Sequence, residues 1–169
     1  NRFTEAAVTF LKRYAAGDFG DRPFFLYVAY TAPHDPRETH ADFHDRYPAD
    51  EIELPPNFAP TPKFDSGFLN GRDEMLVPSP RPEGQVRHEI ADYYAMTAHL
   101  DHGLGRVYAV MRELGLDQDT LTEHTADHGL AVGQHGLMGK QNLYDHSIRV
   151  PLIAAGPGVA EGRASDTLC

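Results

Sequence analysis

The run Phe24-Phe25-Leu26-Tyr27-Val28-Ala29-Tyr30 is the longest apolar stretch of the chain and constrains its fold more than any other feature. Because successive residues are apolar, a strand here would be apolar on both faces, as in the middle of a parallel sheet. A buried helix could have the same composition. The short length, the aromatic content and the bracketing Pro23 and Pro33 favour the strand.

Helices and further strands are predicted on both sides of this run. Thr4 is the expected N-cap of a first helix that ends at Gly17. A longer helix ends at Gly115, and strands are predicted over 119–125 and 150–155. One face of the long helix is traced by Ile90, Tyr93, Tyr94, Thr97, Leu100, Leu104, Val107, Tyr108 and Met111. Alternating strands and helices predict an α/β fold with a mostly parallel sheet flanked by helices.

Residues 35–85 form a polar, proline-rich segment that fits no long helix or strand. Such a long loop within a compact domain is usually either functional, as a lid or substrate wall, or disordered. Because the segment begins directly after His34, we expect it to border any pocket that contains this histidine.

The composition excludes several classes of protein. With 169 residues, 41% of them hydrophobic, the chain is in the range of one globular domain. A formal charge of -10 disfavours nucleic acid as a partner. The single cysteine, Cys169, excludes an internal disulfide and any multi-cysteine metal site. No stretch is apolar for long enough to predict a membrane span.

The side chains best suited to catalysis or metal binding follow the predicted strands, where the ligand sites of open α/β sheets lie. His34 comes after the first strand, and Asp127-His128-Gly129 comes after the second. In a turn, adjacent Asp and His side chains can reach one divalent cation. On residue type alone, a capping Asp beside a surface His is the commoner explanation, and a structural hydrogen bond explains His34 equally well. Lys140 follows a glycine-containing stretch and would be either a solvated lysine or an anion ligand.

Three stretches together resemble the sulfatase family. The first is the continuous run from Asp127-His128-Gly129 through Gly139-Lys140 to Ile153. The second is Pro23–Val28 leading to Ala32-Pro33-His34-Asp35-Pro36, and the third extends from Tyr93-Tyr94-Ala95-Met96 to Gly105-Arg106. Order and spacing agree over nearly the whole chain outside the proline-rich segment.

The resemblance implies an alkaline-phosphatase-like α/β fold and a formylglycine nucleophile acting beside a divalent cation. By similarity, Asp127 and His128 are metal ligands, for Ca²⁺ first and for Mn²⁺ or Mg²⁺ as alternatives. Lys140 would bind sulfate oxygens, and His34 would contact the sulfate or help the leaving oxygen depart. His135 would contact either the substrate or the side chains that bind the metal. The substrate would be a small-molecule or carbohydrate sulfate ester, and periplasmic, secreted or lysosomal locations fit the family.

Two family features are missing from the sequence. It contains no Cys/Ser-x-Pro-x-Arg nucleophile motif and lacks the N-terminal acidic pair of the metal site. We therefore interpret residues 1–169 as an incomplete, middle part of a sulfatase catalytic domain, with 35–85 as a loop insertion, and expect it to be inactive as given. Phosphonate monoester and phosphodiester hydrolases share the Asp-His-Gly and later Lys pattern and remain an alternative. A metal-binding or interaction module without catalysis is another.

Overall fold

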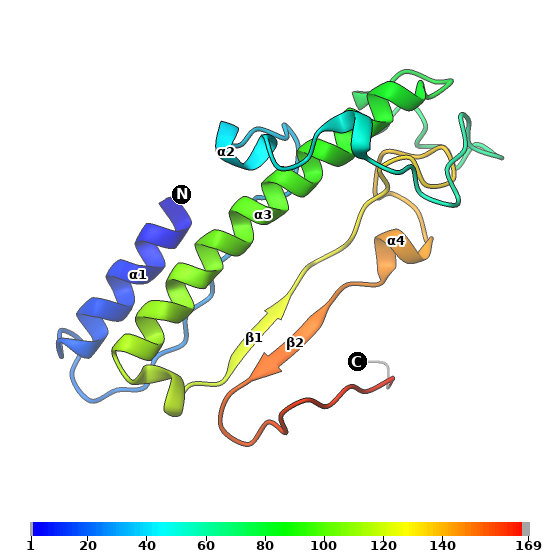
Figure 1. Ribbon diagram of the computed structural model, residues 1–169. Helices are drawn as coiled ribbons and strands as arrows, with labels where there is room; N and C mark the ends of the chain where they lie inside the picture. Colours follow the sequence, from blue (N-terminus) through cyan, green and yellow to red (C-terminus); the bar gives the residue numbers. More distant parts are fainter. Residues whose placement is uncertain (1, 167–169) are drawn as a thin grey trace. The chain divides into compact units, whose positions relative to one another are not determined.

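The computed structural model describes residues 2–166 and divides the chain into two compact units (Figure 1). The described part of the first unit comprises residues 2–28, 105–125 and 151–166. The second unit comprises Ala29–Leu104 and Ala126–Val150, and it contains the predicted site residues. None of the helices among the described residues combines the length and the hydropathy that a membrane crossing requires.

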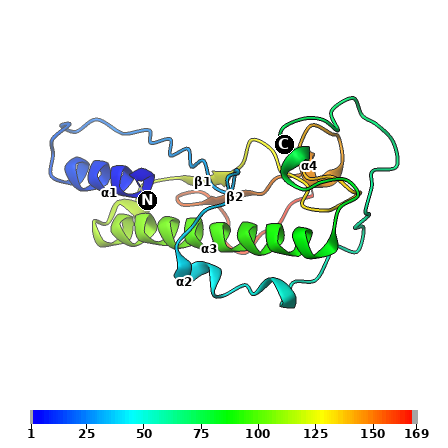
Figure 2. The same ribbon diagram turned by 90° about the horizontal axis from the view of Figure 1, so that it is seen from above.

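Helix α1 (Arg2–Ala15) packs against the part of α3 (Glu83–Glu113) that belongs to the first unit. Figures 1 and 2 both show α1 alongside this part of α3. Helix α1 begins before Thr4, which is fully buried, so the prediction that Thr4 is its N-cap was wrong. The core of the first unit contains Ala7, Val8, Leu11, Val107 and Met111. An ion pair of 2.7 Å between Arg106 and Glu5 adds a polar contact between the two helices.

Helix α3 is the long helix that the apolar periodicity predicts. It spans 31 residues and ends before Gly115, whose φ of 70° lies in the left-handed region. Within the first unit Val107 and Met111 are buried, and within the second unit Ile90 and Ala91 are buried. The helix begins at Glu83, inside the segment predicted to be a loop.

The apolar run 24–30 is extended but belongs to no strand among the described residues. Phe24, Leu26 and Val28 pack against the core of the first unit, whereas Phe25 and Tyr27 are 91% and 81% exposed. The prediction of a central strand buried on both faces is therefore wrong for the described chain. The physical reason is that no described element packs on the face that carries Phe25 and Tyr27, and no described strand pairs with the run.

The sheet of the first unit has two strands, β1 (Thr122–Thr125) and β2 (Leu152–Ala155), and they are antiparallel. Thr122 pairs with Ala155, and Thr125 pairs with Leu152. The expected mostly parallel sheet is not found among the described residues. The connection between β1 and β2 contains no helix longer than the four-residue α4 (Asp145–Ile148), so it provides no helical crossover of the kind that usually joins parallel strands. Glu123 in β1 is exposed, so its charge remains solvated.

The second unit is built around the proline-rich segment and the first part of α3. Up to residue 82 the segment contains only the short helices α2 (Ala41–His44), η1 (Ala49–Glu51) and η2 (Glu74–Leu76), as expected, whereas its last residues, 83–85, belong to α3. It is nevertheless part of the core, because Ile52 and Val77 are buried. They join a cluster with Val86, Ile90, Ala91, Val132 and Met138. The segment therefore lacks long helices and strands but contributes side chains to the hydrophobic core of this unit.

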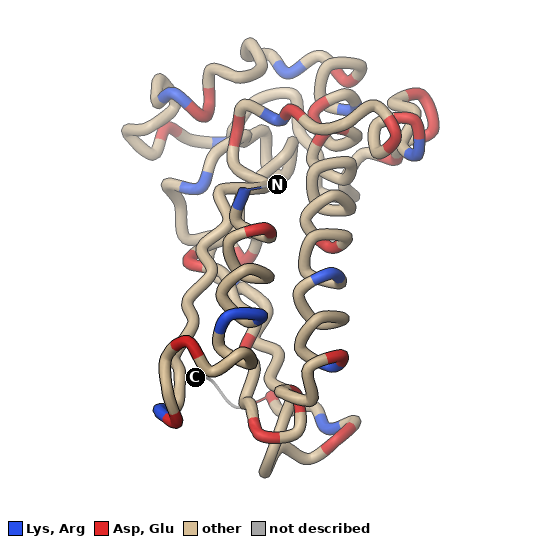
Figure 3. Tube along the Cα trace, turned by 90° about the vertical axis from the view of Figure 1, so that its left-hand side faces the viewer, with Lys and Arg blue, Asp and Glu red and all other residues tan. Residues whose placement is uncertain are grey.

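Charged residues are dispersed along the chain. Figure 3 shows acidic positions interspersed with basic positions on helices and loops. The formal charge of -10 therefore does not arise from one acidic element. Carboxylates spread in this way are those of an ordinary solvated surface, so the charge alone does not indicate a cation site.

Candidate functional site

His34 lies in a turn, where its backbone N–H donates to the Thr31 carbonyl at 2.9 Å. Its Nδ1 lies 2.8 Å from the backbone oxygen of Asp35 and 3.2 Å from Oδ1 of the same residue. Both oxygens are acceptors, so we assign the proton of the neutral ring to Nδ1. The lone pair then belongs to Nε2, which lies 2.8 Å from Nζ of Lys140.

Lys140 meets His34 although 106 positions separate them in the sequence. Its Nζ donates to His34 Nε2 and also lies 3.2 Å from Oδ2 of Asp73. The Lys140 side chain is only 18% exposed, so these contacts are partly shielded from water. The structure thus brings together the two residues that the sulfatase resemblance assigns to sulfate.

Asp73 and its neighbour Glu74 support the chain around Lys140. Burial acts to raise the pKa of Asp73, but hydrogen bonds from Gln141 and Lys140 and the charges of Lys140 and Arg72 lower it on balance. Asp73 is therefore ionised at neutral pH and attracts the ammonium group of Lys140.

The Glu74 carboxylate accepts hydrogen bonds from the backbone N–H groups of Met138 and Gly139, both at 2.9 Å. A side chain at position 139 would not fit, because a Cβ there would lie 2.8 Å from Glu74 Oε1. Arg81 Nη2 donates to Glu74 Oε2 at 2.6 Å, and both side chains are at most 5% exposed. Burial lowers the pKa of Arg81, while the charge of Glu74 opposes this shift. A buried ion pair therefore fixes the backbone immediately before Lys140.

Sequence reasoning missed Asp73, Glu74 and Arg81. They lie in the proline-rich segment, where charged residues are expected to face solvent. No local motif marks them, because the groups that they hold at positions 136–140 lie more than 50 positions away in the sequence.

Asp127 and His128 contact each other in the turn that follows β1. Nε2 of His128 lies 3.6 Å from Oδ2 of Asp127. Nδ1 of His128 lies 3.0 Å from the carbonyl oxygen of Gly129, an acceptor, so we assign a proton to Nδ1, and Nε2 faces the Asp127 carboxylate. One carboxylate oxygen and one imidazole nitrogen at this separation are suited to share a divalent cation, and a carbonyl that fixes the tautomer is typical of ligating histidines.

The structure does not place this pair in contact with His34 or Lys140. Among residues 2–166 no hydrogen bond or ion pair joins the two pairs of side chains, and no group of three or more His, Cys, Asp or Glu side chains is arranged to hold a metal. Asp127 is also 87% exposed along its side chain. The expected convergence of all four residues on one anion-sized volume stays a prediction.

Gly129 explains why the turn after Asp127-His128 is tight. Its N–H donates to the carbonyl of Ser147 at 2.9 Å. A Cβ at position 129 would lie 2.0 Å from the His146 carbonyl oxygen, so any larger residue would push the two backbone segments apart. This contact anchors the Asp127-His128 turn to α4.

His135 is the one non-glycine residue with a positive φ in the described part of the chain, at 55°. Its ring stacks on Tyr144 with 4.1 Å between centroids, and its Nε2 lies 3.1 Å from Nδ2 of Asn57. Non-glycine residues in the left-handed region cluster at functional sites, which is consistent with a role for His135. Asn57 is a partner that sequence reasoning missed, and no described contact links His135 to His34 or Lys140.

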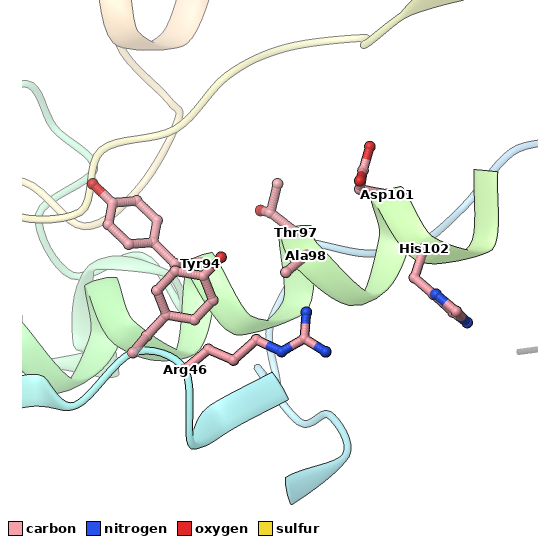
Figure 4. A pocket seen from close by; sticks show the side chains of 7 residues that line it. Arg46, Tyr94, Thr97, Ala98, Asp101 and His102 are labelled. Atoms are coloured by element: carbon pink, nitrogen blue, oxygen red, sulfur yellow. The ribbon is translucent and has the colours of Figure 1, made fainter. Parts of the chain in front are cut away.

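A separate hollow lies on the second unit and contains none of the predicted site residues. Figure 4 shows Asp101 and His102 pointing to different sides of α3, so they do not form one ligand set. The lining residues are Arg46, Tyr47, Tyr94, Thr97, Ala98, Asp101 and His102.

Comparisons with known proteins cover nearly the whole chain. The family model described as Sulfatase matches residues 1–168. The multifunctional alkaline phosphatase superfamily protein PehA of Trinickia caryophylli is 33% identical over 172 residues, covering 92% of this chain and 32% of PehA. Iduronate 2-sulfatase of Mus musculus is 32% identical over 170 residues, covering 92% of this chain and 30% of that protein.

A likeness of fold extends to solved structures. The phosphonate monoester hydrolase SpPMH from Silicibacter pomeroyi superposes with a TM-score of 0.69 at 24% identity. The superposition covers 92% of this chain and 33% of that structure. The fold is therefore a partial α/β piece of the alkaline-phosphatase-like kind. The chain spans about a third of the length of the curated relatives it matches.

Proposed function

Because the chain belongs to the sulfatase family, we propose that it is part of the catalytic domain of a sulfuric ester hydrolase. The observation that carries this proposal is the contact between His34 and Lys140 at 2.8 Å. An ammonium group and an imidazole ring from distant segments meet here, and preorganised groups of this kind suit the binding of a tetrahedral anion.

In this proposal Lys140 and His34 bind the sulfuryl group. Sulfuryl transfer increases the negative charge on the peripheral and leaving oxygens, where an ammonium group stabilises it. His34 holds one proton on Nδ1 through Asp35, so its Nε2 faces Lys140 as an acceptor. If Nε2 takes a proton from solvent in place of the hydrogen bond from Lys140, the ring carries two protons and can donate the one on Nε2 to the leaving oxygen, which returns the ring to its neutral form.

We further propose that Asp127 and His128 are two ligands of a divalent cation, Ca²⁺ in the first place and Mn²⁺ or Mg²⁺ otherwise. The support is the 3.6 Å separation of Asp127 Oδ2 from His128 Nε2 and the tautomer fixed by Gly129. When bound, such a cation neutralises charge on the substrate oxygens. The proposal requires further carboxylates and a formylglycine nucleophile from sequence preceding Asn1, and it implies that residues 1–169 alone are inactive.

The substrate in this proposal is a small-molecule or carbohydrate sulfate ester. His135 either contacts this substrate or contacts the side chains that bind the metal. A phosphonate or phosphodiester substrate is the second candidate, since the fold is shared with a phosphonate monoester hydrolase. Sulfate and phosphonate monoesters both present a tetrahedral centre with oxygens, so the described residues suit either one.

The test is a comparison of the two ester classes with the complete gene product that contains this chain. We expect kcat/KM for 4-nitrophenyl sulfate to exceed that for 4-nitrophenyl phenylphosphonate. The reverse order would favour the phosphonate candidate. Hydrolysis of neither ester, by protein loaded in turn with Ca²⁺, Mn²⁺ and Mg²⁺, would favour a non-catalytic module and overturn the proposed function.

A further inference from the structure

Five side chains in the second unit form a closed ring of polar contacts. His34 contacts Asp35 at 3.2 Å, and Asp35 pairs with Arg72. The adjacent Asp73 accepts from Arg72 at 3.2 Å and pairs with Lys140 at 3.2 Å. Lys140 closes the ring at His34. Three segments that are far apart in the sequence thus meet in one network.

Charges alternate along four members of this ring, Asp35, Arg72, Asp73 and Lys140. The two carboxylates, Asp35 and Asp73, each lie between cationic or donor groups, and both side chains are only 9% exposed. Ion pairs with one shielded partner are screened less by water than surface pairs. Arg72 is the outward member, with 61% of its side chain exposed, and it joins the two carboxylates to each other.

Lys140 has one hydrogen-bond donor to spare in this arrangement. An ammonium group carries three N–H donors. One is directed to Nε2 of His34 and one to Oδ2 of Asp73, at 2.8 Å and 3.2 Å. The third is available for an oxygen of a bound anion. A lysine held at two points loses little further side-chain entropy when it binds, which favours affinity.

We propose that Arg72 and Asp73 are positioning residues that hold His34 and Lys140 at a fixed separation for the anion. This inference rests on the proposed function, because it assigns the anion to these two side chains. Asp73 acts through Lys140, and Arg72 acts through Asp35 on His34. The proline-rich segment therefore contributes to catalysis through Arg72 and Asp73, which contact the neighbours of the substrate and not the substrate itself. This role is independent of any contact between the segment and the leaving group.

A double-mutant cycle in the complete gene product tests this inference. Asp73→Asn keeps the shape of the side chain but removes its charge. In the presence of Lys140 we expect it to lower kcat/KM for an aryl sulfate by about 10-fold to 100-fold, mainly through kcat, since a misplaced group costs up to ~10²-fold. In a Lys140→Ala background we expect the same substitution to change kcat/KM less than ~2-fold, because contacting residues are non-additive.

Asp50→Asn is the matched control, because Asp50 is an exposed aspartate of the same segment. It should leave kcat/KM within about 2-fold of wild type in both backgrounds. Equal losses from Asp73→Asn with and without Lys140 would show that Asp73 only supports folding, and the inference would be overturned.

A second measurement separates this inference from the proposed function. The ¹⁵N resonances of the His34 ring report whether Nε2 accepts a hydrogen bond and where the ring proton resides. We expect Asp73→Asn, but not Asp50→Asn, to shift the Nε2 resonance because Lys140 loses its anchor. An unchanged resonance overturns the inference. An inactive wild-type enzyme with the expected shift would overturn the proposed function and leave the positioning contact established.

Discussion

Nζ of Lys140 lies 2.8 Å from Nε2 of His34, and the same nitrogen lies 3.2 Å from the carboxylate of Asp73. A lysine in this position is not a mobile surface group. Its backbone is fixed by Glu74 through the N–H groups of Met138 and Gly139, and its ammonium group is fixed by Asp73 and His34. The local structure around the proposed anion site is therefore organised before any ligand binds.

Removal of the buried arginine is expected to destabilise the fold strongly. Arg81→Met would leave Glu74, which is 5% exposed, as an unpaired charge in the interior. Breaking a buried ion pair in this way costs about 3–5 kcal/mol. Urea unfolding measures the loss. The exposed pair of Arg149 and Asp145, 78% exposed on both sides, provides the control, and Arg149→Met should cost less than about 1 kcal/mol. Similar losses for both variants would contradict the buried role of Arg81.

Acidification is expected to lower the free energy of unfolding, and His146 is one source of this effect. Burial, and then the neighbouring His135, lower the pKa of His146 below its ordinary value of 6.5, while Asp145 acts in the opposite direction. The unfolded state therefore takes up a proton at a higher pH than the folded state. The contribution of His146 to stability is complete above the pKa that His146 has in the unfolded state. It is lost as the pH falls toward the lower pKa that His146 has in the folded state.

The free energy of unfolding should thus decrease as the pH falls below the ordinary histidine value of 6.5, and less steeply in His146→Gln. His40→Gln is the control, because the His40 side chain is 77% exposed. Denaturant titrations at several pH values provide the slopes. A slope that is the same for wild type and His146→Gln would exclude this histidine as a source of the pH dependence.

Weak binding of a divalent cation is expected at Asp127 and His128. Two ligands leave most of the coordination sphere of Ca²⁺ to water, so residues 1–169 should bind it with low affinity. Calorimetry should show this binding lost in Asp127→Ala and retained in Asp145→Ala, an equally exposed aspartate. Tight, stoichiometric Ca²⁺ binding that survives Asp127→Ala would mean that the metal is held elsewhere.

Substrate choice is expected to depend on the exposed part of the proline-rich segment. Residues 63–68 are exposed, and they include Phe64 and Phe68. Their replacement by Gly and Ser in the complete gene product should change kcat/KM for carbohydrate sulfate esters more than for 4-nitrophenyl sulfate. The discrimination arises on the leaving-group side, because the sulfate is common to both substrates. Equal losses on both would show that this stretch supports the fold without selecting the substrate.

Local patterns predicted the helices, whereas pairing between distant segments could not be predicted. The period of 3.6 along α3 and the glycine at its end depend only on neighbouring residues. The end of the helix at Gly115 is confirmed, as is the burial of Ile90, Val107 and Met111 on the predicted face. Tyr94 and Thr97, also assigned to that face, are exposed. Strand direction depends on which segments meet. The run 24–30 and the antiparallel pairing of β1 with β2 therefore departed from prediction.

The candidate site shows the same division. His34 and Lys140 were identifiable from their places in the sequence and from the sulfatase resemblance, and the structure brings them together. Asp73, Glu74 and Arg81 were not, because nothing near them in the sequence distinguishes a buried charge from a solvated one. Their roles become visible only when residues 136–141 fold back onto the proline-rich segment.

The most direct test of sulfate binding by Lys140 is the value of kcat/KM for 4-nitrophenyl sulfate in the Lys140→Ala variant of the complete gene product. Removal of one preorganised donor to the reacting oxygens typically costs about 10²–10³-fold. We predict a loss of this size in protein that stays folded, because Asp73 keeps its hydrogen bonds from Arg72 and Gln141 when Lys140 is removed. A kcat/KM within about 2-fold of wild type would contradict the assignment of Lys140 to the sulfate.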